Sequence, residues 1–372
     1  MANITPITPN NNQQVMTLSW LANAAGINKW TQTDLQNAID GISGTYWSPG
    51  YDWNVVWGPA YYEPKDSSKI GNTMFVAQQG TWYVIAIAGT NPHSTFDWVQ
   101  EDGDIAPTPW TYYTVAGNVT TGDNLGLTNL LTLTSPNTLQ AFLASLSDKE
   151  TIQLTITGHS LGGALSPLLT MALMDPNSSA SSGINLSYWK QVTLLATAGP
   201  TPGDATFAAY VQNFVTNNPS QLTADFIWNS NDIVPHAWSL TPPKVKTETN
   251  TLQELPAIYP DVALPGDSCV SAAITSAINN ATPYTYTQFD SIPGFTGQLQ
   301  PYGGTELSKL LWGESSKYLA QADYQHTQAY IDNFACSSWF PPNDICNKPD
   351  KAERLYAEFC VIYKAHGGTG CV

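Results

Sequence analysis

Two patterns of hydrophobic and polar residues alternate along the middle of the chain. A period of two places Ile152, Leu154 and Ile156 on one face of a strand, and longer helical stretches separate such runs. We predict strands at 74–77, 82–88, 151–158, 191–199 and 224–232, and helices at 16–25, 33–42, 135–146, 164–174, 203–215 and 269–278. Ser135 is the expected N-cap of the third helix, with Pro136 at its first position. Alternating strands and helices predict an α/β fold with a mainly parallel sheet flanked by helices.

A serine flanked by glycines directly follows one of these strands. The segment 158–163 reads GHSLGG and leads into a predicted helix. In a Gly-x-Ser-x-Gly nucleophile elbow, the serine occupies a strained turn between strand and helix, where only small neighbours fit. Ser160 is therefore the candidate nucleophile. A chance match is the alternative, and the strand–turn–helix context disfavours it.

The candidate acid should follow a later strand, because the order in this type of site is Ser, then Asp or Glu, then His. The chain offers Asp225 and Asp232. Asp225 opens a predicted strand and would lie about 10 Å or more toward the wrong end of the sheet. Asp232 closes the segment 224–232, in the loop that leaves the strand, at the end where sites of α/β proteins form. It is the candidate acid, with a turn carboxylate before Pro235 as the alternative.

The same order limits the choice of histidine. Of five histidines, two precede the acid and one follows it too closely to reach the serine easily: His93, His159 and His236. His326, before a late helix, is the candidate base, and His366 in the tail is the next choice. A surface or helix-capping role is the alternative for His326. In a triad, His326 would take the Ser160 proton and return it to the leaving alcohol, while Asp232 holds the imidazole.

Two N–H groups should stabilise the oxyanion that forms in such a reaction. One is the backbone N–H of Leu161, at the start of the helix after the serine. The other should come from the loop after the strand 82–88, where Thr90 could add a hydroxyl. A plain turn residue is the alternative reading of Thr90.

Composition narrows the classes of partner. The formal net charge of −16, from 13 basic and 29 acidic residues, disfavours nucleic acid and charge-driven binding to anionic membranes. No apolar run approaches the roughly 18 residues of a membrane span, and no signal peptide is visible at the N-terminus. No Cys/His spacing indicates zinc, and we expect neither a metal nor a cofactor.

Four of the five cysteines crowd the C-terminal tail 336–372: Cys336, Cys346, Cys360 and Cys371. We expect them to form disulfides that pin the tail in an oxidising compartment, with Cys269 free. This pattern and the many Thr, Ser, Asn and Trp residues favour a secreted protein. Five reduced thiols in a cytoplasmic protein are the alternative.

Together these residues resemble the class 3 lipase family of α/β-hydrolases. The resemblance covers about 70–240 and 320–332. It rests on the segments TGHSLGGALS (157–166), NSNDIVPH (229–236), IAGTN (87–91), STFDWVQED (94–102), GPTPGDATFA (199–208) and HTQAY (326–330). The chain departs from the family at Thr201, where an arginine is usual, and in the long insert between Asp232 and His326.

The resemblance implies a single α/β-hydrolase domain over 1–372 that hydrolyses carboxylic esters, as a triacylglycerol lipase at an oil–water interface. An esterase on soluble or plant-wall esters (feruloyl-esterase-like), a phospholipase and a non-catalytic binding protein are the alternatives. The family's lid position falls on 91–110, with Phe96 and Trp98 as lid candidates. The insert 240–315 is expected to form a cap, with a peripheral embellishment as the alternative. Acyl chain length and oligomeric state stay open.

Overall fold

The computed structural model describes nine stretches of the chain. They are residues 5–63, 71–89, 104–113, 116–181, 184–240, 251–289, 294–302, 313–340 and 348–365. Thr90 and the lid candidates Phe96 and Trp98 lie outside these stretches, as do His93 and His366.

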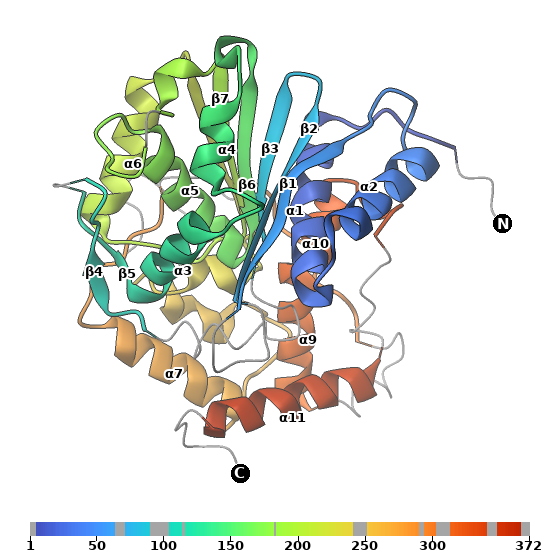
Figure 1. The fold of residues 1–372 in the computed structure, drawn as a ribbon. Helices are drawn as coiled ribbons and strands as arrows, with labels where there is room; N and C mark the ends of the chain where they lie inside the picture. Colours follow the sequence, from blue (N-terminus) through green and yellow to red (C-terminus); the bar gives the residue numbers. More distant parts are fainter. Residues whose placement is uncertain are drawn as a thin grey trace.

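A six-stranded sheet in the order β1-β2-β3-β6-β7-β8 forms the centre of the molecule (Figure 1). The strands are β1 (Asn54–Tyr62), β2 (Asn72–Gln79), β3 (Trp82–Ile87), β6 (Gln153–His159), β7 (Gln191–Thr197) and β8 (Leu222–Ile227). β1, β2 and β3 pair antiparallel, whereas β3, β6, β7 and β8 pair parallel. The predicted α/β fold with a mainly parallel sheet is confirmed. A small second sheet pairs β4 (Pro107–Pro109) with β5 (Asn118–Thr120).

Helices cover both faces of the sheet (Figure 1). They are α1 (Asn11–Asn28), α2 (Gln32–Tyr46), α3 (Thr121–Thr132), α4 (Leu139–Ser145), α5 (Leu161–Met174), α6 (Ala205–Asn217), α7 (Cys269–Ala281), α9 (Glu314–His326), α10 (Gln328–Asn333) and α11 (Pro349–Ala365). Successive residues of β3 point to opposite faces. Ile85 and Ile87 join one apolar core with α3, α5 and α6, and Val84 and Ala86 join another with α1, α2 and α10.

The helix predicted at 135–146 begins later than expected. Its N-cap is Thr138, whose hydroxyl accepts the N–H of Ala141 at 3.3 Å, and α4 starts at Leu139. The Ser135 N–H instead bonds to the Asn137 carbonyl at 2.9 Å, closing a tight turn before the helix. A helix tends to start where a side-chain hydroxyl can accept an unpaired N–H of the first turn, and Thr138 supplies that hydroxyl here.

The insert between Asp232 and His326 builds a third apolar core. The predicted helix in it is present as α7, which Ser268 caps by accepting the N–H of Ser271 at 3.2 Å. Its buried side chains pack with Ile233, Val234 and Trp238 from the loop after β8, and with residues of α9. The insert therefore shares a core with the segments that hold the candidate acid and base.

The tail joins the insert, which corrects the predicted cysteine pairing. Cys269 at the start of α7 forms a disulfide with Cys360 of α11, and Cys336 is free and buried. Figure 1 shows α11 returning beside α7 at one end of the molecule. The expectation that Cys269 is free rested on the clustering of the other cysteines in the tail. It is wrong because α11 folds back and pairs Cys360 with a cysteine 91 residues earlier. Cys346 and Cys371 lie outside the described residues.

Candidate active site

Ser160 lies on a strained turn between β6 and α5. Its φ of 61° and ψ of −126° place it in a region that side chains rarely adopt. A Cβ on Gly158 would overlap the backbone of Gly162, and one on Gly162 would overlap the carbonyl of Ile87. The Ser160 N–H bonds to the Thr197 carbonyl at 3.0 Å, which ties the turn to β7. These contacts give the predicted nucleophile elbow its shape.

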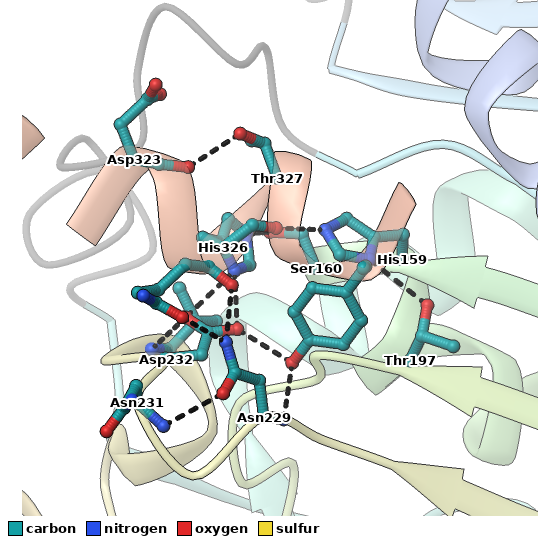
Figure 2. Close-up of polar contacts among 12 residues, drawn as sticks. His159, Ser160, Thr197, Asn229, Asn231, Asp232, Asp323, His326 and Thr327 are labelled. Carbon is teal, nitrogen blue, oxygen red and sulfur yellow. Dashed lines mark hydrogen bonds and ion pairs between the residues drawn. The ribbon is translucent and has the colours of Figure 1, made fainter. Parts of the chain in front are cut away.

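The structure brings the three candidate triad residues together (Figure 2). The His326 Nε2 atom lies 2.8 Å from the Ser160 Oγ atom. The His326 Nδ1 atom lies 2.9 Å and 3.1 Å from the two carboxylate oxygens of Asp232. Asp232 is fully buried and His326 is 4% exposed, while Ser160 is partly open to solvent. The geometry is that of a nucleophile, a base and an orienting acid.

Two further donors hold the Asp232 carboxylate. The Val234 N–H bonds to Oδ1 at 3.0 Å, and the Tyr330 hydroxyl bonds to Oδ2 at 2.9 Å. Burial, and secondly the Asp232 charge, raise the pKa of Tyr330 well above its ordinary value, so the hydroxyl keeps its proton to donate. A carboxylate held by three groups has little freedom to turn away from the imidazole.

Asn229 organises the chain around the acid. Its Oδ1 atom accepts the N–H groups of Asn231 at 3.0 Å and Gly297 at 2.7 Å. Its Nδ2 atom donates to the carbonyl of Gln325 at 2.9 Å and to the Gln325 Oε1 atom at 2.7 Å. One buried amide thus ties the acid loop and the insert to the end of α9, next to His326.

Two of the rejected candidates lie outside the triad. Asp225 is an exposed residue inside β8, rather than its first residue as the sequence suggested, and it does not join the triad. His236 is buried, and its ring nitrogens have no hydrogen-bond partner among the described residues. Burial lowers the pKa of His236 to about 3, so the ring is neutral.

The structure describes one of the two residues predicted as oxyanion donors. Leu161 is the first residue of α5, so its N–H is one of the orphan donors at a helix N-terminus. Thr90 lies outside the described residues, but Gly89 before it is placed beside the nucleophile: a Cβ there would lie 3.0 Å from Ser160 Cβ. The Asn23 side chain of α1 accepts the Gly89 N–H at 2.6 Å.

Sequence reasoning missed the residues that support the triad. Tyr330 lies in the segment HTQAY, and its position four residues after His326 is the one signal that could have found it. Asn229 and Asn23 carry no comparable signal, because their partners lie far away in the sequence. Among the described residues, no cluster of His, Cys, Asp and Glu could hold a metal ion, and no helix combines the length and hydropathy of a membrane span.

The chain is similar to known proteins in sequence pattern and in structure. The sequence pattern of the class 3 lipase family matches residues 84–241. The crystal structure of M37 lipase is similar over 94% of this chain and 100% of that one, with 26% identity and a TM-score of 0.72. A lipase from Rhizopus microsporus var. chinensis shares 17% identity over 66% of this chain and 79% of its own, with a TM-score of 0.39. A triacylglycerol lipase from Penicillium expansum shares 15% identity over 62% and 74%, with a TM-score of 0.38.

No curated protein matches the chain significantly in sequence. The family match contains the elbow, the acid and residues 84–87 of β3, whereas His326 lies beyond it. The structure supplies what the match lacks, because His326 meets both Ser160 and Asp232. The predicted resemblance to the class 3 lipase family is confirmed over residues 84–241, and the similarity to the M37 lipase structure extends over 94% of the chain.

Proposed function

We propose that the protein is a triacylglycerol lipase in which Ser160, His326 and Asp232 act as the catalytic triad. One observation carries the proposal: the His326 imidazole bridges the serine hydroxyl at 2.8 Å and the buried carboxylate at 2.9 Å. Because the carboxylate only accepts, Nδ1 carries a proton and Nε2 is free to accept the proton of Ser160. This arrangement lets His326 activate the serine as a nucleophile.

The reaction divides into two half-reactions at the same atoms. Ser160 Oγ attacks the ester carbonyl carbon as His326 Nε2 takes its proton, and the resulting oxyanion accepts the Leu161 N–H. The tetrahedral intermediate collapses, the C–O bond to the alcohol breaks, and His326 returns the proton to the leaving oxygen. The products of this half-reaction are the free alcohol and an ester of Ser160.

Water completes the cycle. His326 takes a proton from water as its oxygen attacks the acyl-enzyme carbonyl, and the second intermediate releases Ser160 Oγ, which regains the proton. The fatty acid leaves with the oxygen of water. Asp232 stabilises the imidazolium in both half-reactions without becoming protonated itself.

The shared apolar core supports a role for the insert 240–315 as a cap within one domain. Its helix α7 packs with the loop that carries Asp232 and with the helix that ends at His326. The disulfide between Cys269 and Cys360 supports an extracellular location. Phe96 and Trp98 stay a prediction for the lid, and Thr90 stays a prediction for the second oxyanion donor.

A series of substrates tests the proposal. We expect hydrolysis of p-nitrophenyl esters with acyl chains from short to long, and a rise in rate when a triglyceride exceeds its solubility. A fluorophosphonate should label the wild-type protein once, at Ser160. The Ser160→Ala variant should lose both labelling and turnover, while a Ser145→Ala control at an exposed serine of α4 should keep both.

Three outcomes would redirect the proposal. Turnover of soluble esters without the rise at the interface would assign an esterase. Release of fatty acid from phospholipid vesicles in preference to triglyceride would assign a phospholipase. A protein that neither hydrolyses esters nor reacts with the fluorophosphonate would be a binding protein on a hydrolase fold.

A further inference from the structure

The residue before the nucleophile is a buried histidine that packs among three rings. His159 ends β6 and is 2% exposed. Its ring centroid lies 4.9 Å from that of Trp20 in α1, 4.9 Å from that of Tyr330 in α10 and 4.8 Å from that of His326. The catalytic roles described above do not use this side chain.

Both ring nitrogens of His159 have partners (Figure 2). Nε2 lies 2.8 Å from the main-chain carbonyl oxygen of His326, and Nδ1 lies 3.1 Å from the Thr197 hydroxyl. A carbonyl only accepts, so the contact at 2.8 Å requires a proton on Nε2. Burial, and secondly the nearby His326, hold the pKa of His159 well below its ordinary value, so the ring is neutral and Nδ1 is an acceptor. The Thr197 hydroxyl that faces Nδ1 has one proton and also lies 3.2 Å from the Gly158 carbonyl, to which it can donate.

The carbonyl that His159 meets lies at a helix end. His326 is the last residue of α9, and the chain leaves helical geometry at Thr327, with φ of −119° and ψ of −81°. Carbonyls in the last turn of a helix lack partners inside the helix. His159 is covalently joined to Ser160, and its side chain donates to the His326 carbonyl. The residue next to the nucleophile therefore holds the backbone of the residue whose side chain must reach Ser160.

We propose that His159 is a positioning residue that clamps the backbone of His326 to the nucleophile elbow. This inference rests on the proposed ester hydrolysis at Ser160. Two contacts of 2.8 Å then join the same two stretches of chain: the side chain of His326 to Ser160, and the side chain of His159 to the backbone of His326. With the backbone fixed, rotation of the His326 side chain is the one freedom left, and Asp232 limits that rotation.

The charge of His159 also matters for the reaction. His326 becomes an imidazolium in each half-reaction, and a cation at 4.8 Å between ring centroids would oppose it. A neutral ring that donates only from Nε2 avoids this repulsion. A lysine or arginine could supply the same donor, but would add the opposing charge.

A matched pair of variants tests the clamp. The His159→Gln variant places an amide N–H the same number of bonds from Cβ as Nε2, whereas the shorter His159→Asn amide can reach only the position of Nδ1. We expect His159→Asn to lower kcat on a soluble ester about 10- to 100-fold with KM within about twofold, as for a small displacement of a catalytic group. His159→Gln should keep kcat within about threefold of the wild type.

Controls separate positioning from folding. Active sites are titrated with a fluorophosphonate, so that kcat refers to folded enzyme, and thermal unfolding is followed for each variant. Thr17→Val removes another buried hydroxyl, on α1, which accepts the Trp339 side-chain N–H at 3.0 Å. This variant should lower stability without changing kcat.

Equal kcat values for the Gln and Asn variants, whether both near the wild type or both low, would overturn the clamp. An active wild type that loses activity with Ser160→Ala would then leave the proposed function standing. A wild type without esterase activity would overturn the proposed function and the clamp together.

Discussion

The nucleophile and the base reach the same point by different means. Ser160 is fixed by backbone packing within the sheet, where the chain around Gly158 and Gly162 leaves no room for side chains. His326 is fixed by polar contacts between segments far apart, such as Asn229 with Gln325 and Tyr330 with Asp232. The elbow that carries Ser160 lies inside the family match, and the end of α9 that carries His326 lies outside it.

This difference predicts two kinds of sensitivity. Backbone contacts in a close-packed elbow cannot relax around an added atom, so changes there should act as all or none. A hydrogen-bond network loses one contact at a time, and each loss should weaken catalysis or stability by a limited amount. The expected effects therefore run from the reacting atoms, through the elbow, to the network and the tail.

The largest effect is expected at the triad itself. His326→Ala should lower kcat by about 10⁴- to 10⁶-fold, similar to Ser160→Ala, because triad members act as a unit. Asp232→Asn should cost about 10⁴-fold, since it leaves the imidazole in the wrong tautomer. The measurement is kcat on a soluble ester with circular dichroism to verify folding. Turnover within tenfold of the wild type for His326→Ala would remove His326 from the site and direct attention to His366.

The next effect tests the elbow as a unit of backbone packing. Gly158→Ala should abolish activity, because the new methyl group would overlap the backbone of Gly162. The variant should either lose cooperative folding or fold without reacting with the fluorophosphonate. Gly41→Ala in α2 is the control, because beyond its chain neighbours and its own helix backbone no heavy atom lies within 4 Å of the position its Cβ would take. That variant should be as active as the wild type. A folded and fully active Gly158→Ala variant would show that the elbow can relax.

The same contrast explains what the sequence revealed. The elbow and the parallel strands follow local patterns, in which a period of two and a glycine spacing are visible without a fold. β1 was missed because its pairing with β2 shifts register twice, at Trp57 and before Ala60, which breaks the alternation. α9 was missed because its buried face includes Ser316, Gln321 and Gln325, so hydrophobic periodicity does not mark it.

Tyr330→Phe probes the network with a change of one atom. The lost hydroxyl leaves Asp232 with one donor fewer and the Asn229 N–H without its acceptor at 2.9 Å. We expect kcat to fall about 10-fold and the free energy of unfolding to fall by about 1–3 kcal/mol. Tyr318→Phe removes an equally buried hydroxyl, which donates to the Leu255 carbonyl at 2.9 Å, and should lower stability alone. If both variants keep wild-type kcat, Tyr330 is a structural residue and the network on the acid ends at Val234.

The smallest effect on catalysis is expected at the disulfide. The tail helix α11 is covalently joined to α7 and packs near α9, so it touches the histidine side and not the elbow. Replacing Cys269 and Cys360 by serine removes a link across 91 residues and should lower the free energy of unfolding by about 2–4 kcal/mol. Because the contacts of Asn229 and His159 still hold His326, kcat at 25 °C should change by less than about threefold.

Unfolding in urea and kcat per titrated site are the measurements, and peptide mapping without reductant verifies the pairing in the wild type. A loss of kcat as large as that of Tyr330→Phe would mean that the tail, rather than the network around Asn229, keeps the end of α9 in place.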